Sequence, residues 1–155
     1  MTTIMSVSGT AGLTIHGKRM IAESMYAEGK AFLGAAALLR RNGGYEYVVL
    51  HLLCQGIEIV LKGLLLKIDY DLYKPQLKKF GHNLLKVTDS AIKAAGLLSL
   101  RPNIRAEMET LNKLYSQHLL RYGSGYDLLV NPSTIASRLV LRRIAALLRL
   151  IEHKG

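Results

Sequence analysis

The stretch from Tyr45 to Asp69 reads YEYVVLHLLCQGIEIVLKGLLLKID; it is long, mostly apolar and free of proline. At about 1.5 Å per residue it predicts a buried helix of ~37 Å. The polar side chains in this stretch recur at steps of four, three and four, which places them on one helix face. We call this face the polar seam: His51, Gln55, Glu58 and Lys62.

Glu58 and Lys62 stand one helical turn apart with the acid first, the favourable orientation for an ion pair within a helix. Their neighbours in the stretch are apolar, and a buried ion pair needs further hydrogen bonds to be stable. Two interpretations stay open. The polar seam satisfies its own hydrogen bonds, in a groove between helices or facing solvent, or it binds a ligand.

The apolar stretch is long enough to span a bilayer, and the mean hydropathy of the chain is +0.18. A spanning helix would bring Glu58 and Lys62 near the bilayer centre, at a cost of ~2.5–3.5 kcal/mol each. A buried core helix is therefore the better interpretation, and we expect no membrane association.

The one cysteine, Cys54, is expected to be a buried structural thiol. No signal peptide is recognisable in the first 20 residues, so a cytoplasmic location is expected.

The formal net charge of the 155-residue chain is +10 and its pI is near 9.9. An excess of this size favours nucleic acid or another polyanion as a partner. Around Pro75, lysines alternate with aromatic residues, which is typical of a nucleic-acid contact surface. The alternative is an ordered loop whose aromatic side chains enter the core. The residues concerned are Tyr70, Tyr73, Lys74, Lys78, Lys79 and Phe80.

The remaining pattern is helical and predicts one domain. Residues 1–17 are expected to form an irregular arm, and residues 18–155 a single domain. The helical patterns and their short links predict an all-α, up-and-down bundle of about five helices. Asn103 and Asn131 are the expected N-caps of the last two helices, and residues 70–81 are expected to form a loop with a turn of helix inside it. The expected helices are 18–41, 45–69, 82–95, 104–122 and 132–153.

Motifs that carry known chemistry are absent from the sequence. The five histidines have no metal-ligand spacing, so we expect neither a metal nor a cofactor. The glycines fall at predicted helix ends rather than in a phosphate-binding loop. What remains are polar residues that a bundle can bring together: Glu58 and Lys62, His82 at the start of a helix, and Arg121 with Tyr122 at the end of another.

These residues carry a family resemblance. Glu58-x-x-x-Lys62-Gly63, then Gly81-His82-Asn83-Leu84, then Arg121-Tyr122 resemble the HEPN domains, all-α modules of prokaryotic toxin–antitoxin and defence systems. The resemblance covers residues 18 to 153. It implies a homodimer that handles RNA or a nucleotide, with a nucleotidyltransferase-type protein as a candidate partner. It also implies that Glu58, Lys62, His82, Arg121 and Tyr122 bind the ligand.

Catalytic members of that family carry an arginine followed, after four to six residues, by a histidine, and this chain has no such pair. The nearest spacing joins Lys113 to His118, and lysine is a poor substitute for the guanidinium fork that grips phosphate. Three hypotheses follow. The chain is a module that binds RNA, a nucleotide or a partner protein; or a degenerate metal-independent ribonuclease that uses Lys113 and His118; or a structural scaffold for dimerisation.

Overall fold

The computed structural model of the chain describes residues 12–117 and 135–154, and these ranges contain helices and no strand. The all-α class predicted from the sequence is confirmed. Five of the described helices have eleven residues or more, and three short helical segments lie between the second and the third of these. In chain order the elements are α1 Ile15–Arg41, α2 Glu46–Ile68, α3 Tyr70–Tyr73, η1 Lys74–Gln76, α4 Leu77–Phe80, α5 Leu84–Ala94, α6 Pro102–Ser116 and α7 Arg138–Lys154.

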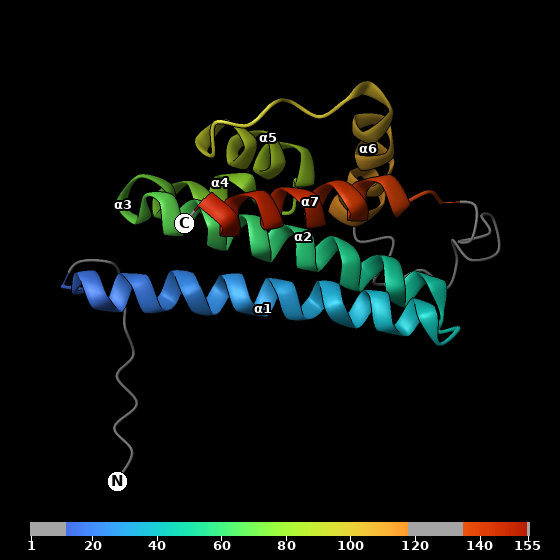
Figure 1. Ribbon diagram of the computed structural model, residues 1–155, viewed down its shortest axis with the longest axis horizontal. Helices are drawn as coiled ribbons and strands as arrows, with labels where there is room; N and C mark the ends of the chain where they lie inside the picture. The colour runs from blue at the N-terminus through green and yellow to red at the C-terminus, as the bar shows by residue number, and fades with distance from the viewer. Residues whose placement is uncertain (1–11, 118–134, 155) are drawn as a thin grey trace, which may run out of the picture.

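Helix α2 lies at the centre, with α1 along one side and α5, α6 and α7 on the other (Figure 1). Its length and composition alone would allow it to cross a membrane, yet 67% of its most apolar window is buried inside the protein. Leu50, Leu53, Ile57, Leu61 and Leu65 are almost completely buried and form the axis of the main core. The central position that the sequence predicts for this helix is thus observed.

Helices α1 and α2 form an antiparallel hairpin (Figure 1). The turn follows Asn42, and Gly43 adopts a φ of +70°, a left-handed conformation that glycine reaches at little cost. The two helices approach closely because three glycines lie between them. A Cβ at Gly29 would overlap the backbone of Val60, and a Cβ at Gly63 would overlap the backbone of Tyr26; Gly56 is packed against Leu33 in the same way.

The segment between α2 and α5 is more helical than expected. Residues 70–81, predicted as a loop with one turn of helix, instead form α3, η1 and α4 in succession. Asp69 begins this segment by accepting a hydrogen bond at its side chain from the Leu72 N–H. Tyr70 is buried in a small second cluster with Ala22 and Leu66, so at this position the core interpretation of the aromatic residues is confirmed.

Several predicted helix boundaries are wrong. Helix α1 begins before Lys18, because Thr14 caps it by accepting from the Gly17 N–H. Helix α6 begins at Pro102, so Arg101 and not Asn103 is its N-cap. Residues 135–137 are not helical and α7 starts at Arg138. The predicted cap Asn131 lies outside the described residues, as do residues 118–122 at the predicted end of the preceding helix.

The arrangement also differs in part from a simple up-and-down bundle. Figure 1 shows α6 running across the direction of α1 and α2. The inward face of α7 consists of Val140, Ile144, Leu147 and Leu148, whereas the neighbouring Leu139 is 39% exposed. The start of α7 is held against α6 because the buried Glu107 carboxylate accepts from the Val140 N–H at 3.0 Å.

Candidate functional site

A buried carboxylate joins three elements of the fold. Glu58 of α2 is 7% exposed, and it receives hydrogen bonds from Lys62 Nζ at 2.7 Å and from the Tyr115 hydroxyl at 2.5 Å. Nδ1 of His82 lies 3.0 Å from the second carboxylate oxygen, Oε2. We call Glu58, Lys62, His82 and Tyr115 the Glu58 cluster. It connects α2 to α6 and to the junction between α4 and α5.

The local sequence explains how His82 reaches Glu58. Gly81 ends α4 with a φ of +53°, and Asn83 caps α5 by accepting from the Lys86 N–H. His82 therefore stands between a helix end and a helix start, where the chain changes direction. Lys62 holds this turn a second time, because its Nζ also donates to the Gly81 carbonyl at 2.8 Å.

Helix α6 secures the same junction from the other side. The Asn112 side-chain oxygen accepts from the Leu84 N–H, one of the α5 amides that have no partner within the helix. Three positions later on α6, Tyr115 reaches Glu58. Its ring also contacts two imidazoles: the centroid of the His82 ring lies at 5.6 Å and that of the His51 ring at 6.0 Å.

The electrostatics of the cluster favour an ionised carboxylate. Burial by itself raises the pKa of Glu58, but hydrogen bonds from Lys62, Tyr115 and His82 together outweigh it. The pKa of Glu58 is therefore below its ordinary value. A carboxylate only accepts hydrogen bonds, so His82 Nδ1 carries a proton and donates. The buried acid thus orients a histidine whose side chain is 50% exposed.

The structure brings together three of the residues expected to bind a ligand: Glu58, Lys62 and His82. Arg121 and Tyr122 lie outside the described residues, and so does His118. Lys113 is exposed on α6 and is not part of the Glu58 cluster. The proposed Lys113/His118 pair therefore stays a prediction.

Tyr115 is the member of the cluster that the sequence analysis did not single out. The signal in the sequence was weak: Tyr115 follows the apolar spacing of Met108 and Leu111, which indicates core packing. Its ring is indeed buried with those residues. Only the position of its hydroxyl next to Glu58 reveals a second role.

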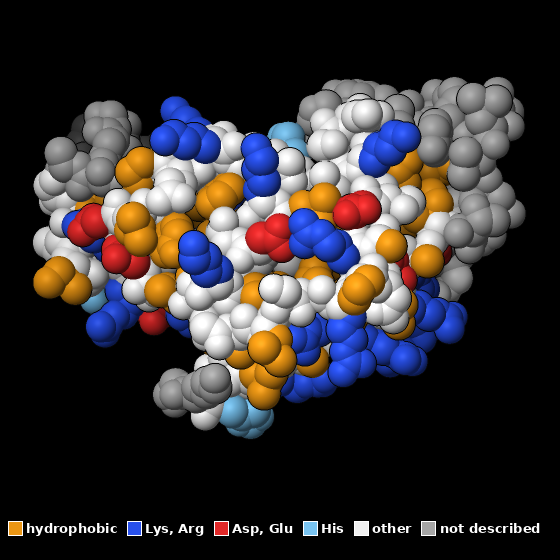
Figure 2. Space-filling view, turned by 90° about the horizontal axis from the view of Figure 1, so that it is seen from above, with side chains coloured by type: hydrophobic (Ala, Val, Ile, Leu, Met, Phe, Trp, Pro, Cys, Tyr) orange, Lys and Arg blue, Asp and Glu red, His pale blue; other side chains and the backbone are white. Residues whose placement is uncertain are grey.

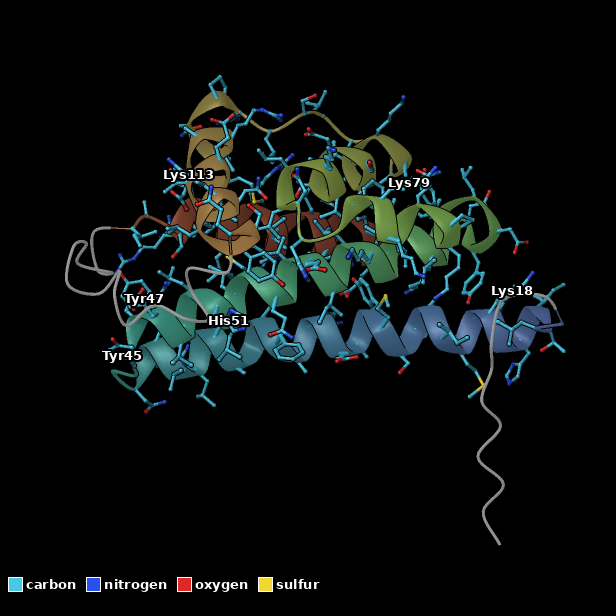
Figure 3. All side chains as sticks on the ribbon, turned by 180° about the vertical axis from the view of Figure 1, so that it is seen from behind. Lys18, Tyr45, Tyr47, His51, Lys79 and Lys113 are labelled. Atoms are coloured by element: carbon cyan, nitrogen blue, oxygen red, sulfur yellow. The ribbon has the colours of Figure 1, made fainter. Side chains whose placement is uncertain are left out.

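Exposed lysines lie close to His82 in the chain. Lys78 and Lys79 are exposed at the end of α4, and Lys86 is exposed in the first turn of α5. Figure 2 shows Lys and Arg side chains scattered over one face and gathered along one edge, with fewer Asp and Glu. Figure 3 shows Lys79 and Lys113 on opposite sides of α5, and His51 on α2 below α6. The described residues contain no group of three His, Cys, Asp or Glu side chains suited to hold a metal ion.

A search of known protein families, curated proteins and solved structures finds no match to this chain.

Proposed function

We propose that this chain is a HEPN-like helical module that binds RNA at the surface around His82. The observation that carries the proposal is the Glu58 cluster. It holds a half-exposed histidine rigidly at a helix junction, with exposed Lys78, Lys79 and Lys86 nearby in the chain. Three of the residues that carry the family resemblance meet there, which supports the same interpretation.

The chemistry of the surface suits a single-stranded ligand. Lysine ammonium groups neutralise backbone phosphates and release counterions, which provides affinity without sequence preference. An imidazole held in place by a buried carboxylate offers a flat ring on which a base stacks, and a ring nitrogen for a hydrogen bond. Its orientation is set before the ligand arrives, so little ordering entropy is lost on binding.

The test is binding of a labelled oligouridylate, followed by fluorescence anisotropy at several salt concentrations. Lys78→Gln with Lys79→Gln should lower the affinity and reduce the salt slope by about 1.4, since each single-strand phosphate contact contributes about 0.7. Lys67→Gln with Lys93→Gln removes the same charge elsewhere and is the control. Equal losses in both double variants, or binding that does not weaken with rising salt, would contradict the proposal.

The Glu58 cluster has a second explanation, a purely structural one, because it connects three elements of the fold. The double variant Glu58→Gln with Lys62→Met distinguishes the structural explanation from the RNA-binding one. If this double variant folds and binds RNA as the native chain does, the cluster is only a scaffold. We expect it to fold with lowered stability and to bind RNA more weakly, because His82 loses the carboxylate that orients it.

The resemblance carries further predictions that stay open: a homodimer, and a nucleotidyltransferase-type partner protein. Sedimentation of the purified chain measures the first. The ribonuclease hypothesis is tested by RNA cleavage, which it requires to be present in the native chain and lost in His118→Ala.

A further inference from the structure

We propose a second binding site, for the phosphate group of a nucleotide unit, in a cleft between the start of α6 and the first turns of α7. The cleft has a volume of about 400 Å³ and shares no residue with the Glu58 cluster. Three arginines line it, and we call it the arginine cleft: Arg101, Arg142 and Arg143, with Leu98, Ile104 and Leu139.

The fold explains why these arginines converge. Arg101 is the N-cap of α6, and Arg142 and Arg143 lie in the second turn of α7. The two helices are tied together nearby, because Glu107 of α6 accepts from the Val140 N–H. Positive charges from two distant parts of the sequence are thus held in a fixed relation to each other.

The charge balance of the cleft is the strongest argument for an anion. Among the residues that the structure describes, no acidic side chain lines it. Within the described residues, none of the three arginines has an ion pair, whereas the neighbouring Arg105 grips both carboxylate oxygens of Asp89 at 2.9 and 3.1 Å. Like charges held close together repel, and a bound anion removes that cost.

The residue type and the rim narrow the class of anion. A guanidinium presents a planar fork of N–H donors that matches phosphate oxygens two at a time. The N-terminus of α6, a helix of 15 residues, adds partial positive charge beside Arg101. Leu98 is 83% exposed and Leu139 is 39% exposed at the same cleft. Apolar groups beside a phosphate site suit a nucleoside, whose base has two apolar faces.

A nucleoside phosphate reaches this cleft from two sources: a free nucleotide, or a unit of an RNA strand. The first experiment titrates the native chain with AMP and follows backbone amides by NMR. We expect saturable shifts confined to residues 98–104 and 139–143. Arg142→Gln with Arg143→Gln should weaken AMP binding by about tenfold or more, since it removes two charged donor groups.

The matched control is Arg41→Gln with Arg149→Gln, two exposed arginines that do not line the cleft. We expect it to change AMP affinity by less than about threefold, because only long-range charge is lost. Arg142→Lys with Arg143→Lys keeps the charge and removes the guanidinium fork. Its AMP affinity should therefore lie between those of the Arg142→Gln with Arg143→Gln variant and the control.

The second experiment uses RNA oligonucleotides that carry a 5′-phosphate or a 5′-hydroxyl. Preference for the 5′-phosphate that is lost in Arg142→Gln with Arg143→Gln assigns the cleft to strand ends. Equal affinity for both, weakened by the same variant and not by the control, assigns it to backbone phosphates. If AMP causes no localised shifts and neither RNA is weakened more by the cleft variant than by the control, the proposal is overturned.

The AMP experiments at the arginine cleft are independent of the RNA-binding test at His82. Lys78→Gln with Lys79→Gln should leave AMP binding at the arginine cleft unchanged. AMP binding without any RNA binding would therefore support the cleft and contradict the function proposed above.

Discussion

Glu58 is a buried side chain that stabilises the fold and also orients a residue of the proposed RNA-binding surface. A carboxylate that is 7% exposed needs donors, and it receives them from Lys62 one turn along its own helix and from Tyr115 on α6. Its contact with His82 then fixes the turn between α4 and α5. Removing the charge should therefore be felt in stability and in the orientation of the exposed imidazole.

The stability contributed by Glu58 should depend on pH. Because its pKa is lowered in the folded state, the contribution is present above the ordinary carboxyl pKa and is lost as pH falls through the folded pKa. Glu58→Gln should lower the free energy of unfolding at pH 7 by about 2–4 kcal/mol. Urea unfolding from pH 7 to pH 3 measures this difference, which should narrow below about pH 4.5. A gap that stays constant over this range would refute the ionic role.

Cys54 should be chemically inert while the chain is folded. Its side chain is fully buried, and burial together with the nearby Glu58 charge raises the pKa of the thiol. The thiolate is the reactive species, so a thiol reagent at pH 8 should react with Cys54 only on unfolding. Reaction rates in buffer and in urea test this, and rapid labelling in buffer would show that α2 opens locally.

Helix α1 depends on glycine at one position and tolerates it at another. Gly29 and Gly34 are both in the interior of the helix. A Cβ on Gly29 would overlap the Val60 backbone, whereas one on Gly34 would meet nothing within 4 Å. Gly29 is needed for the close approach of α1 to α2, whereas Gly34 is not.

The two glycines therefore predict opposite effects of the same substitution. Gly29→Ala should cost about 2–3 kcal/mol, because the backbone of α2 has to move away. Gly34→Ala should stabilise the chain by about 0.5–1 kcal/mol through lower backbone entropy in the unfolded state. Urea unfolding of both variants measures the contrast. Similar effects for the two would mean that the hairpin adapts to a side chain at Gly29.

At the scale of the whole molecule, polar contacts near both ends of α7 add to the packing of its apolar face on the core. Near its start, the buried Glu107 carboxylate accepts from the Val140 N–H. Near its end, Glu152 accepts hydrogen bonds from the Tyr26 hydroxyl at 2.9 Å and from Lys30 at 2.8 Å. The first contact is buried, while the Glu152 side chain is 44% exposed. The two should therefore differ in strength.

Glu107→Ala should destabilise the chain by about 1–3 kcal/mol, because the Val140 N–H would be buried without a partner. Hydrogen exchange of the first α7 amides should become faster in this variant. Tyr26→Phe should cost about 1 kcal/mol or less, since water competes for an exposed carboxylate. If Tyr26→Phe proves the more damaging of the two, the end of α7 and not its start holds the helix in place.

Local pattern alone was enough to predict the helical class, the central helix and the polar seam, because helical periodicity depends on residues three and four positions apart. The pairing of Glu58 with Lys62 follows from the same spacing, and both side chains adopt it. Helix starts at Ile15, Pro102 and Arg138 were missed, because capping depends on the path of the chain before each helix.

Tertiary structure alone decided which distant residues meet. Tyr115 joins Glu58 from 57 positions away, and the arginine cleft combines the start of α6 with α7. The apolar spacing around Tyr115 indicates only that its ring is buried, not which acid its hydroxyl reaches. Likewise, the sequence shows that α7 is rich in arginine, but only the packing of α7 on α6 brings Arg142 and Arg143 to one cleft with Arg101. Such contacts depend on how helices cross and how short segments turn, and no local spacing encodes them.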